Sequence, residues 1–300
     1  MLQDGIPTSG PGLGVDVDGE ETTLPAPPVG RPPDLRVVAV DMDGTFLRTG
    51  STYDRPRFTA LRRRMRAAGV RFVVASGNQE AQLLSFFPAA DGLAPDGVVS
   101  DNGAIVLADG VRILETCAPM GALERALAVL DGGGPAFIAS GPDGAYLRQA
   151  ESPEMRELLT FYHPDYRYVA RTTDINGQRV SKIALVDERG FEQAFLDRLQ
   201  AALGGAMVPV VSGHDSVDLI VPGRHKASGL EVLLAHWRLG RGQAAAFGDS
   251  SNDAEMLACV GYGIAMGNAS RVARAAARFT APSNDDDGVL EVLEAWFPAD

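Results

Sequence analysis

"AVDMDGTFLR", residues 39–48, places Asp41 and Asp43 one residue apart at the end of an apolar run. Because strand side chains alternate between faces, both carboxylates point the same way while Met42 points toward the core. Carboxylates roughly 7 Å apart on one strand face repel each other unless a cation or a proton lies between them. A polar turn closed by Gly44 would also explain the stretch by itself, so its interpretation depends on the rest of the chain.

The segments around the acid pair alternate between strand and helix patterns. "LRVVAV" (35–40) and "VRFVVAS" (70–76) are strand-like, and the stretch between them has apolar residues at helical spacing. Connections this short predict a right-handed βαβ unit in a parallel sheet. The C-terminal third repeats the alternation in "KASGLEVLLAHWRLG", "QAAAFGDS", "NDAEMLACV" and "GYGIAM". We therefore expect an α/β protein with a doubly wound, Rossmann-like parallel-sheet core, in which ligands bind at the carboxyl ends of the strands.

The middle third follows a different pattern. Before it, "VVSDNGAIVLADGVRILET" predicts a hairpin that turns at residues 108–110. Residues 119–221 then mix helix-like and strand-like segments, which indicates an inserted α+β cap. We thus expect a core made of residues 35–118 and 222–300, a cap at 119–221, and a flexible Gly/Pro-rich tail at 1–34. The tail lacks a basic start and an apolar h-region, so it does not resemble a secretory signal.

Composition limits the kinds of partner that the chain can bind. Its net charge is −12 at pH 7. Nucleic-acid binding needs a basic face, so this charge argues against a nucleic-acid partner, whereas a small anionic substrate needs only local positive charge. The apolar runs are too short to cross a membrane. Cys117 and Cys259 have no metal-ligand spacing, so we expect reduced cysteines and a cytoplasmic protein.

Two further segments could bind an anion at the same edge of the sheet. Ser76-Gly77-Asn78 follows a strand and opens a helix, so it can offer a hydroxyl and free backbone N–H groups. Lys226 in "PGRHKASGL" lies at a helix start, where a cation opposes the helix dipole unless it faces an anion. Taken singly, the first segment is better explained as an ordinary N-cap and the lysine as a surface charge.

"FGDSSNDAEML" adds more acids where a strand turns into a helix. Asp253 suits the first turn of that helix and Asn252 could cap it, but Asp249 has no such role. In a doubly wound sheet Asp249 could approach Asp41 and Asp43. Converging carboxylates are unfavourable without a hard divalent cation, and oxygen ligands of this kind suit Mg²⁺.

Considered together, these segments predict phosphoryl transfer. The metal and Lys226 would jointly hold a phosphate, Asp41 would act as a nucleophile, and Asp43 would protonate the leaving oxygen. Phosphate monoesters hydrolyse very slowly without help, so charge neutralisation and positioning must supply most of the barrier reduction. As a set, the segments are better explained by this chemistry than by separate structural roles.

The ordered motifs "DMDGT", "SGN", "HKA" and "GDSSND" resemble the four motifs of the haloacid dehalogenase superfamily, with a cap between the second and third. The resemblance is closer to the Cof-type branch, and within it to the SupH-like sugar phosphatases, through "DMDGTFL", "VVASGNQ", "SFFP", "DNGA", "DLIVPG" and "AMGNA". It extends from about Leu35 to the C-terminus. It implies a Rossmann-like core with a C2-type cap, and a Mg²⁺-dependent phosphatase.

The resemblance also implies roles for single residues. Asp41 would be the nucleophile and Asp43 the general acid/base, with Mg²⁺ held by Asp41, Asp249 and the backbone carbonyl of Asp43. The residues implied to contact phosphate or substrate are Ser76, Gly77, Lys226, Asn252 and Asn102, and Asp253 would support the site. Many Cof-type relatives carry Thr-Gly-Arg at the second motif. Here Asn78 stands in place of the arginine, as in the sugar-phosphatase branch, which would leave Lys226 with more of the phosphate charge.

Four other residues carry weaker signals. Asn102 could touch a substrate beneath the cap or simply belong to a turn. Lys182 in "VSKIALV" could face the cleft, but an edge-strand lysine is the favoured interpretation. His214 and Asp215 lie in a cap loop, from which they could contact sugar hydroxyls.

The sequence thus predicts an enzyme, a phosphoric monoester hydrolase that acts on small phosphorylated metabolites, most readily sugar phosphates, through a covalent aspartyl-phosphate. A phosphomutase on the same core is an alternative, and it would yield isomeric sugar phosphate without free phosphate. A catalytically silent sugar-phosphate-binding protein is another, but Asp43 argues against it because a mere binder needs no proton donor. We expect a monomer or small homo-oligomer with no nucleic-acid or membrane partner.

Overall fold

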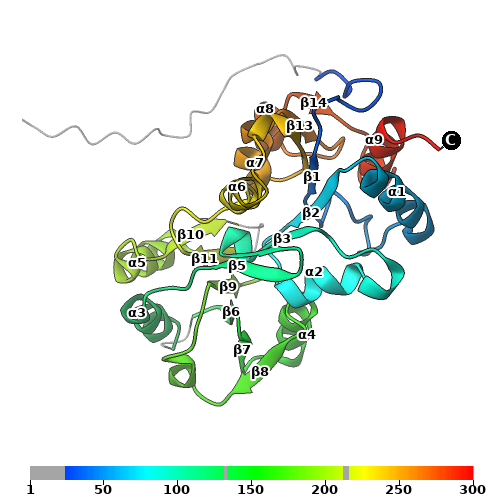
Figure 1. The fold of residues 1–300 in the computed structure, drawn as a ribbon. Helices are drawn as coiled ribbons and strands as arrows, with labels where there is room; N and C mark the ends of the chain where they lie inside the picture. The colour runs from blue at the N-terminus through cyan, green and yellow to red at the C-terminus, as the bar shows by residue number, and fades with distance from the viewer. Residues whose placement is uncertain (1–23, 132–133, 212–215, 300) are drawn as a thin grey trace, which may run out of the picture.

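A computed structural model describes residues 24–131, 134–211 and 216–299, and within them the chain forms two β-sheets. The sheet around β1 lies in the upper part of Figure 1 and the second sheet lies below it. Eight described strands form the first sheet, in the order β14-β13-β12-β1-β2-β3-β4-β5. They span, in that order, Phe279–Thr280, Tyr262–Ala265, Ala244–Gly248, Val37–Val40, Arg71–Ala75, Gly97–Ser100, Ile105–Ala108 and Val111–Glu115. Strands β14 to β3 pair in parallel, whereas β4 and β5 form the predicted antiparallel hairpin.

Helices cover both faces of this core sheet. Figure 1 shows α1, α2 and α9 on one side and α6, α7 and α8 on the other. Their bounds are Arg55–Ala67 (α1), Glu80–Phe86 (α2), Gly288–Trp296 (α9), Lys226–His236 (α6), Ala254–Cys259 (α7) and Arg271–Ala276 (α8). In α1 the apolar side chains of Phe58, Leu61 and Met65 recur at helical spacing and are fully buried. The doubly wound α/β core expected from the sequence is confirmed.

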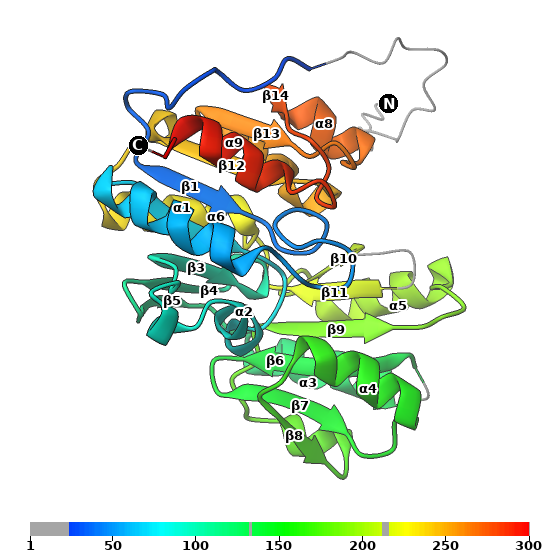
Figure 2. The same ribbon diagram turned by 90° about the vertical axis from the view of Figure 1, so that its right-hand side faces the viewer.

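The second sheet forms the cap, whose described strands are ordered β10-β11-β9-β6-β7-β8. They span, in that order, Val208–Val211, Ser216–Ile220, Lys182–Val186, Ala136–Gly141, Gly144–Arg148 and Tyr166–Val169. Helices α3 (Met120–Asp131) and α5 (Gln193–Leu203) cover one face, and α4 (Pro153–Tyr162) packs on the other, as Figures 1 and 2 show. The chain enters the cap after β5 and leaves it before α6, so the cap is inserted between two halves of the core.

Three neighbouring core strands position the polar residues that the sequence singles out. Strands β12, β1 and β2 lie side by side and run in parallel. All residues of β1 and β12 are buried, as expected for strands covered on both faces. Asp249, Asp41 and Ser76 directly follow β12, β1 and β2. Because carboxyl ends of parallel strands meet at one edge, these three residues are brought together there.

The structure corrects the predicted extent of the tail. Residues 24–34 pack along the core: the Pro25 carbonyl accepts a hydrogen bond from Thr280 N at 2.9 Å, and the Pro28 carbonyl accepts one from Trp296 Nε1 at 3.0 Å. Prolines lack the N–H that regular elements need, but their carbonyls still anchor the segment. Residues 1–23 lie outside the described part of the chain. Among the described helices, none combines the length and apolarity needed to cross a membrane.

Candidate active site

Asp41 is the first residue after β1, and its backbone N–H donates to the Phe247 carbonyl of β12 at 3.1 Å. Met42 is fully buried in the core, whereas Asp41 and Asp43 both line one cavity. The predicted alternation of acids and methionine is therefore confirmed. Asp41 itself is buried and Asp43 is exposed, so the two carboxylates have different surroundings.

Aromatic packing holds the loop that follows the two acids. The buried ring of Phe46 has its centroid 4.9 Å from that of Phe58 and 5.1 Å from that of Tyr53. Phe72 and Phe87 complete the cluster. Each ring pair of this kind stabilises by about 0.5–1.5 kcal/mol beyond its buried area. Phe46 lies three residues after Asp43, so its packing in the core fixes the backbone of Asp43.

Lys226 contacts three of the predicted site residues. Its Nζ donates to Asp41 Oδ1 at 2.6 Å and to Asp253 Oδ1 at 2.7 Å. A longer hydrogen bond of 3.2 Å joins Nζ to Asn252 Oδ1. The lysine is 2% exposed and Asp253 is 0% exposed, so solvent screens these ion pairs little. A cation at the start of α6 is explained by the two carboxylates that it faces.

The charges of this cluster shift its pKa values. Burial by itself would lower the pKa of Lys226, but the charges of Asp253 and Asp41 outweigh burial and raise it. Burial raises the pKa of Asp41 well above its ordinary value, and the like charges of Asp253 and Asp249 add to this effect against the attraction of Lys226. One lysine therefore leaves a surplus of negative charge in the site.

Asp249 reaches the cluster from the end of β12. Thr45 Oγ1 donates to Asp249 Oδ1 at 2.9 Å, which ties the first acidic loop to the last. Gly44 lies between them with a φ of +74°, and a Cβ at this position would lie 2.6 Å from Asp249 Oδ2. Only glycine allows both this backbone conformation and this close approach.

Three carboxylates could hold a metal ion. Asp41, Asp249 and Asp253 each place one oxygen within 4.8 Å of the others. Both oxygens of Asp253 are already engaged: Oδ1 accepts from Lys226, and Oδ2 accepts from the backbone N–H groups of Asp249 and Ser250 at 3.1 and 3.0 Å. Asp253 therefore positions its neighbours, and Asp41 and Asp249 remain to face a cation. Hard oxygen donors with surplus negative charge fit Mg²⁺.

The turn after β2 adds a contact that the sequence did not reveal. Asn78 Nδ2 donates to Asp43 Oδ2 at 2.8 Å. The buried Ser76 Oγ accepts a hydrogen bond from the Asn78 N–H at 3.2 Å, which fixes the turn. The sequence shows that Asn78 stands where many Cof-type relatives carry arginine. It does not show the contact with Asp43, which depends on how two separate loops pack together.

The acids open into a cavity of about 330 Å³ between core and cap. Its core lining comprises Asp41, Asp43, Ser76, Gly77, Asn78, Lys226, Ser250 and Asn252. Its cap lining comprises Leu158, Leu159, Tyr162, His163, Lys182, Ala184, Leu185, Val186, Ser216 and Asp218. Half of these cap residues lie on one sheet face, because the β9–β11 register pairs Ala184 with Asp218 and Val186 with Ser216, and most of the others come from the end of α4. The sequence contains two lysines, and both line this cavity.

The favoured interpretation of Lys182 is wrong. Strand β9 is interior, between β11 and β6, so Lys182 is not an edge-strand residue. Its Nζ reaches the core, where it donates to the Gly77 carbonyl at 2.6 Å, and it lies 3.6 Å from Asp218 Oδ2. Strand pairing on both sides follows from the order of the cap strands, which a short apolar run does not reveal.

The structure bears differently on the predictions for Asn102 and for the cap-loop residues His214 and Asp215. Asn102 is absent from the cavity lining; its Nδ2 donates to Asp218 Oδ2 at 3.0 Å, so it holds a cap residue against the core. Its role in substrate binding stays a prediction. His214 and Asp215 lie outside the described residues.

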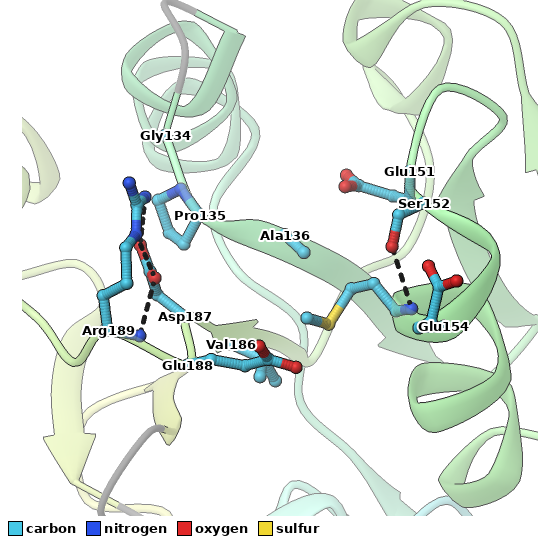
Figure 3. A pocket seen from close by; sticks show the side chains of 11 residues that line it. Gly134, Pro135, Ala136, Glu151, Ser152, Glu154, Val186, Asp187, Glu188 and Arg189 are labelled. Carbon is cyan, nitrogen blue, oxygen red and sulfur yellow. Dashed lines mark hydrogen bonds and ion pairs between the residues drawn. The ribbon is translucent and has the colours of Figure 1, made fainter.

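A larger hollow, about 510 Å³, lies on the cap where β6 begins, β9 ends and α4 begins (Figure 3). Its charged lining residues are four acids, Glu151, Glu154, Asp187 and Glu188, and one base, Arg189, which is paired with Asp187 at 3.0 Å. Such a lining repels a phosphate dianion. We therefore place the substrate in the smaller cavity, beside the two lysines.

The fold and the site together define a capped α/β hydrolase with a carboxylate-rich centre. The chain belongs to the haloacid dehalogenase-like hydrolases, whose family model matches residues 38–293. It is 36% identical over 266 residues to the 5-amino-6-(5-phospho-D-ribitylamino)uracil phosphatase YbjI of Escherichia coli, across 87% of this chain and 95% of that protein. It is 27% identical over 280 residues to the pyridoxal phosphate phosphatase YbhA of the same bacterium, across 86% and 97%.

A solved structure shows the same architecture. SMU.1108c from Streptococcus mutans UA159 has a TM-score of 0.78 and 31% sequence identity to this chain, and the match covers 87% of this chain and 98% of that one. These matches confirm the family, the fold and the enzyme class, a phosphatase, that the sequence motifs predict.

Proposed function

We propose that this phosphatase is Mg²⁺-dependent and hydrolyses small phosphate esters, most readily sugar phosphates, through an aspartyl-phosphate on Asp41. One observation carries the proposal: segments far apart in the sequence supply Asp41, Asp43, Ser76 and Lys226 to one cavity. A nucleophile, a proton donor and a cation are the groups that phosphoryl transfer needs.

The reaction has two steps. In the first, the Asp41 carboxylate attacks phosphorus; a bond from Asp41 to phosphorus forms, the ester P–O bond breaks, and Asp43 gives its proton to the leaving oxygen. In the second, a water molecule gives a proton to the Asp43 carboxylate while its oxygen attacks phosphorus. The bond from Asp41 to phosphorus breaks, inorganic phosphate leaves, and both acids return to their starting states.

Other side chains of the cavity prepare these steps. Lys226 holds Asp41 Oδ1 and supplies positive charge beside the phosphate. Ser76 and Gly77 line the same space and can donate to phosphate oxygens. Asn78 orients Asp43. A Mg²⁺ ion held by Asp41, Asp249 and the Asp43 carbonyl would neutralise negative charge on the phosphoryl group.

The cavity supports a small, polar leaving group. A space of about 330 Å³ is sized for a compact metabolite rather than a polymer. Ser216 and Asp218 place polar groups on its cap side, which suits a hydroxylated ester. Two relatives are named for esters of a ribityl compound and of pyridoxal, both small phosphorylated metabolites.

A phosphate-release screen tests the proposal. We expect sugar phosphates to be hydrolysed faster than nucleotides, pyridoxal phosphate or flavin mononucleotide in the presence of Mg²⁺. We expect EDTA to reduce release to background and added Mg²⁺ to restore it, since the single ammonium of Lys226 does not offset the charge of the surrounding carboxylates. Release that continues unchanged in EDTA would contradict the metal requirement. Isomeric sugar phosphate without free phosphate would instead indicate a phosphomutase.

Asn78→Ala is expected to lower kcat about tenfold, because it frees the rotation of the proton donor Asp43 without removing it. The loss should be larger for an alkyl phosphate, whose leaving oxygen needs a proton, than for p-nitrophenyl phosphate, whose leaving group departs as an anion. Steady-state kinetics on both esters measures this difference. Equal losses would indicate that Asn78 contacts the phosphate rather than acting through Asp43.

A further inference from the structure

His163 closes helix α4 and lines the cavity with one nitrogen unused. The residue is 3% exposed. Its Nδ1 lies 3.0 Å from the Leu159 carbonyl oxygen, and a carbonyl only accepts, so Nδ1 carries the proton. Nε2 is buried and has no hydrogen-bond partner among the described residues. A buried polar atom of this kind is costly unless a ligand pairs with it.

The ring is neutral, and Nε2 is therefore an acceptor. Burial, and then the charge of Lys182, lower the pKa of His163 to about 3 against the opposing effect of the Leu159 carbonyl. With the proton on Nδ1, the neutral ring presents a lone pair at Nε2. The nearby Lys182 ammonium disfavours a cationic ligand at this place. A hydroxyl donor satisfies Nε2 without adding charge.

His163 is placed to contact the leaving group of the substrate rather than its phosphate. Asp43 lines the cavity from the core, and Tyr162 and His163 line the same cavity from the end of α4 in the cap. In the proposed reaction Asp43 protonates the leaving oxygen. A leaving group that extends from Asp43 across the cavity toward the cap would reach this end of α4.

We propose that His163 Nε2 accepts a hydrogen bond from a hydroxyl of the leaving group, which makes His163 a specificity-determining residue for phosphate esters of polyhydroxylated alcohols. This inference rests on the proposed function. A leaving group without a hydroxyl at this place leaves Nε2 unpaired, and sites built around a hydrogen bond discriminate strongly against such analogues.

Two esters with the same six-carbon chain test the inference. D-Sorbitol 6-phosphate carries hydroxyls and n-hexyl phosphate has none, while both are primary alkyl phosphates. The measured quantity is the ratio of kcat/KM for the first ester to that for the second. His163→Asn keeps an amide donor near the Leu159 carbonyl but has no acceptor at the Nε2 position, so we expect the ratio to fall about tenfold. His163→Gln places an amide oxygen near that position, so we expect most of the ratio to return.

Controls separate this role from folding and from the proposed function. His236→Asn changes an exposed histidine at the end of α6 and should leave the ratio at its wild-type value. His163→Met matches glutamine in length, but its thioether is only a weak acceptor, so the Gln and Met pair makes the same comparison if the asparagine variant does not fold. An unchanged ratio in His163→Asn, or equal ratios for Gln and Met, would overturn the inference. If the wild-type enzyme hydrolyses neither ester but releases phosphate from other esters in the screen, the inference is overturned and the proposed function stands. If it also releases no phosphate in the screen, both are overturned.

Discussion

Asp41→Asn is expected to lower kcat for phosphate release by at least about 10⁴-fold, because it replaces the nucleophile with an amide that attacks phosphorus poorly. Asparagine keeps the shape of the side chain and one oxygen for Lys226, which donates to Asp41 Oδ1 at 2.6 Å. Folding should therefore survive, and circular dichroism checks this point. Steady-state phosphate release with saturating Mg²⁺ and the best ester of the screen gives kcat.

A matched control and a covalent trap sharpen this prediction. Asp131→Asn makes the same chemical change at the exposed end of α3 and should retain wild-type kcat. Borohydride reduces an acyl phosphate to an alcohol, so treatment of the wild-type enzyme during turnover should convert residue 41 to homoserine, as detected by peptide mass spectrometry. Mg²⁺-dependent release by Asp41→Asn, or homoserine at another aspartate, would show that Asp41 is not the nucleophile.

Much of the site could be predicted because its groups follow local patterns. Alternation along one strand places Asp41 and Asp43 on the same side, and Met42 is indeed fully buried. Lys226 is unfavourable at a helix start, and its two carboxylate partners account for it. Residues that break a local rule thus indicated where distant segments had to meet.

The contacts between separate loops of the core, and between core and cap, could not be predicted in the same way. Asn78 binds Asp43, Lys182 binds the Gly77 carbonyl, and His163 faces the cavity only because α4 ends there. Each depends on how one loop or domain packs on another, and no spacing within a segment encodes that packing. A buried lysine in an apolar strand looks the same in sequence whether the strand is interior or at an edge.

Lys226→Met is expected to lower the free energy of unfolding by about 3–5 kcal/mol near pH 7.5 without Mg²⁺, because it leaves buried carboxylates without their counter-charge. Asp41 and Asp253, which lie 2.6 and 2.7 Å from Nζ, are the groups affected. Without the ammonium, the folded protein holds the pKa of Asp41 above its value in the unfolded chain, so the folded protein binds a proton that the unfolded chain does not. The deficit relative to wild type should therefore shrink as the pH falls toward about 5. Urea denaturation at several pH values measures it.

Two further measurements separate charge from packing at Lys226. Lys226→Met leaves two buried carboxylates unpaired, and Asp253→Asn removes the charge of one of them. The double variant should therefore be more stable than Lys226→Met alone, even though it carries one more substitution. Mg²⁺ should restore part of the stability of Lys226→Met, because the ion binds the folded carboxylates and not the unfolded chain. A loss of unfolding free energy that does not change with pH, with Mg²⁺ or with the second substitution would mean that the lysine stabilises the site through its aliphatic stem. In that case the surplus of carboxylate charge would not be the reason that this cavity needs a cation.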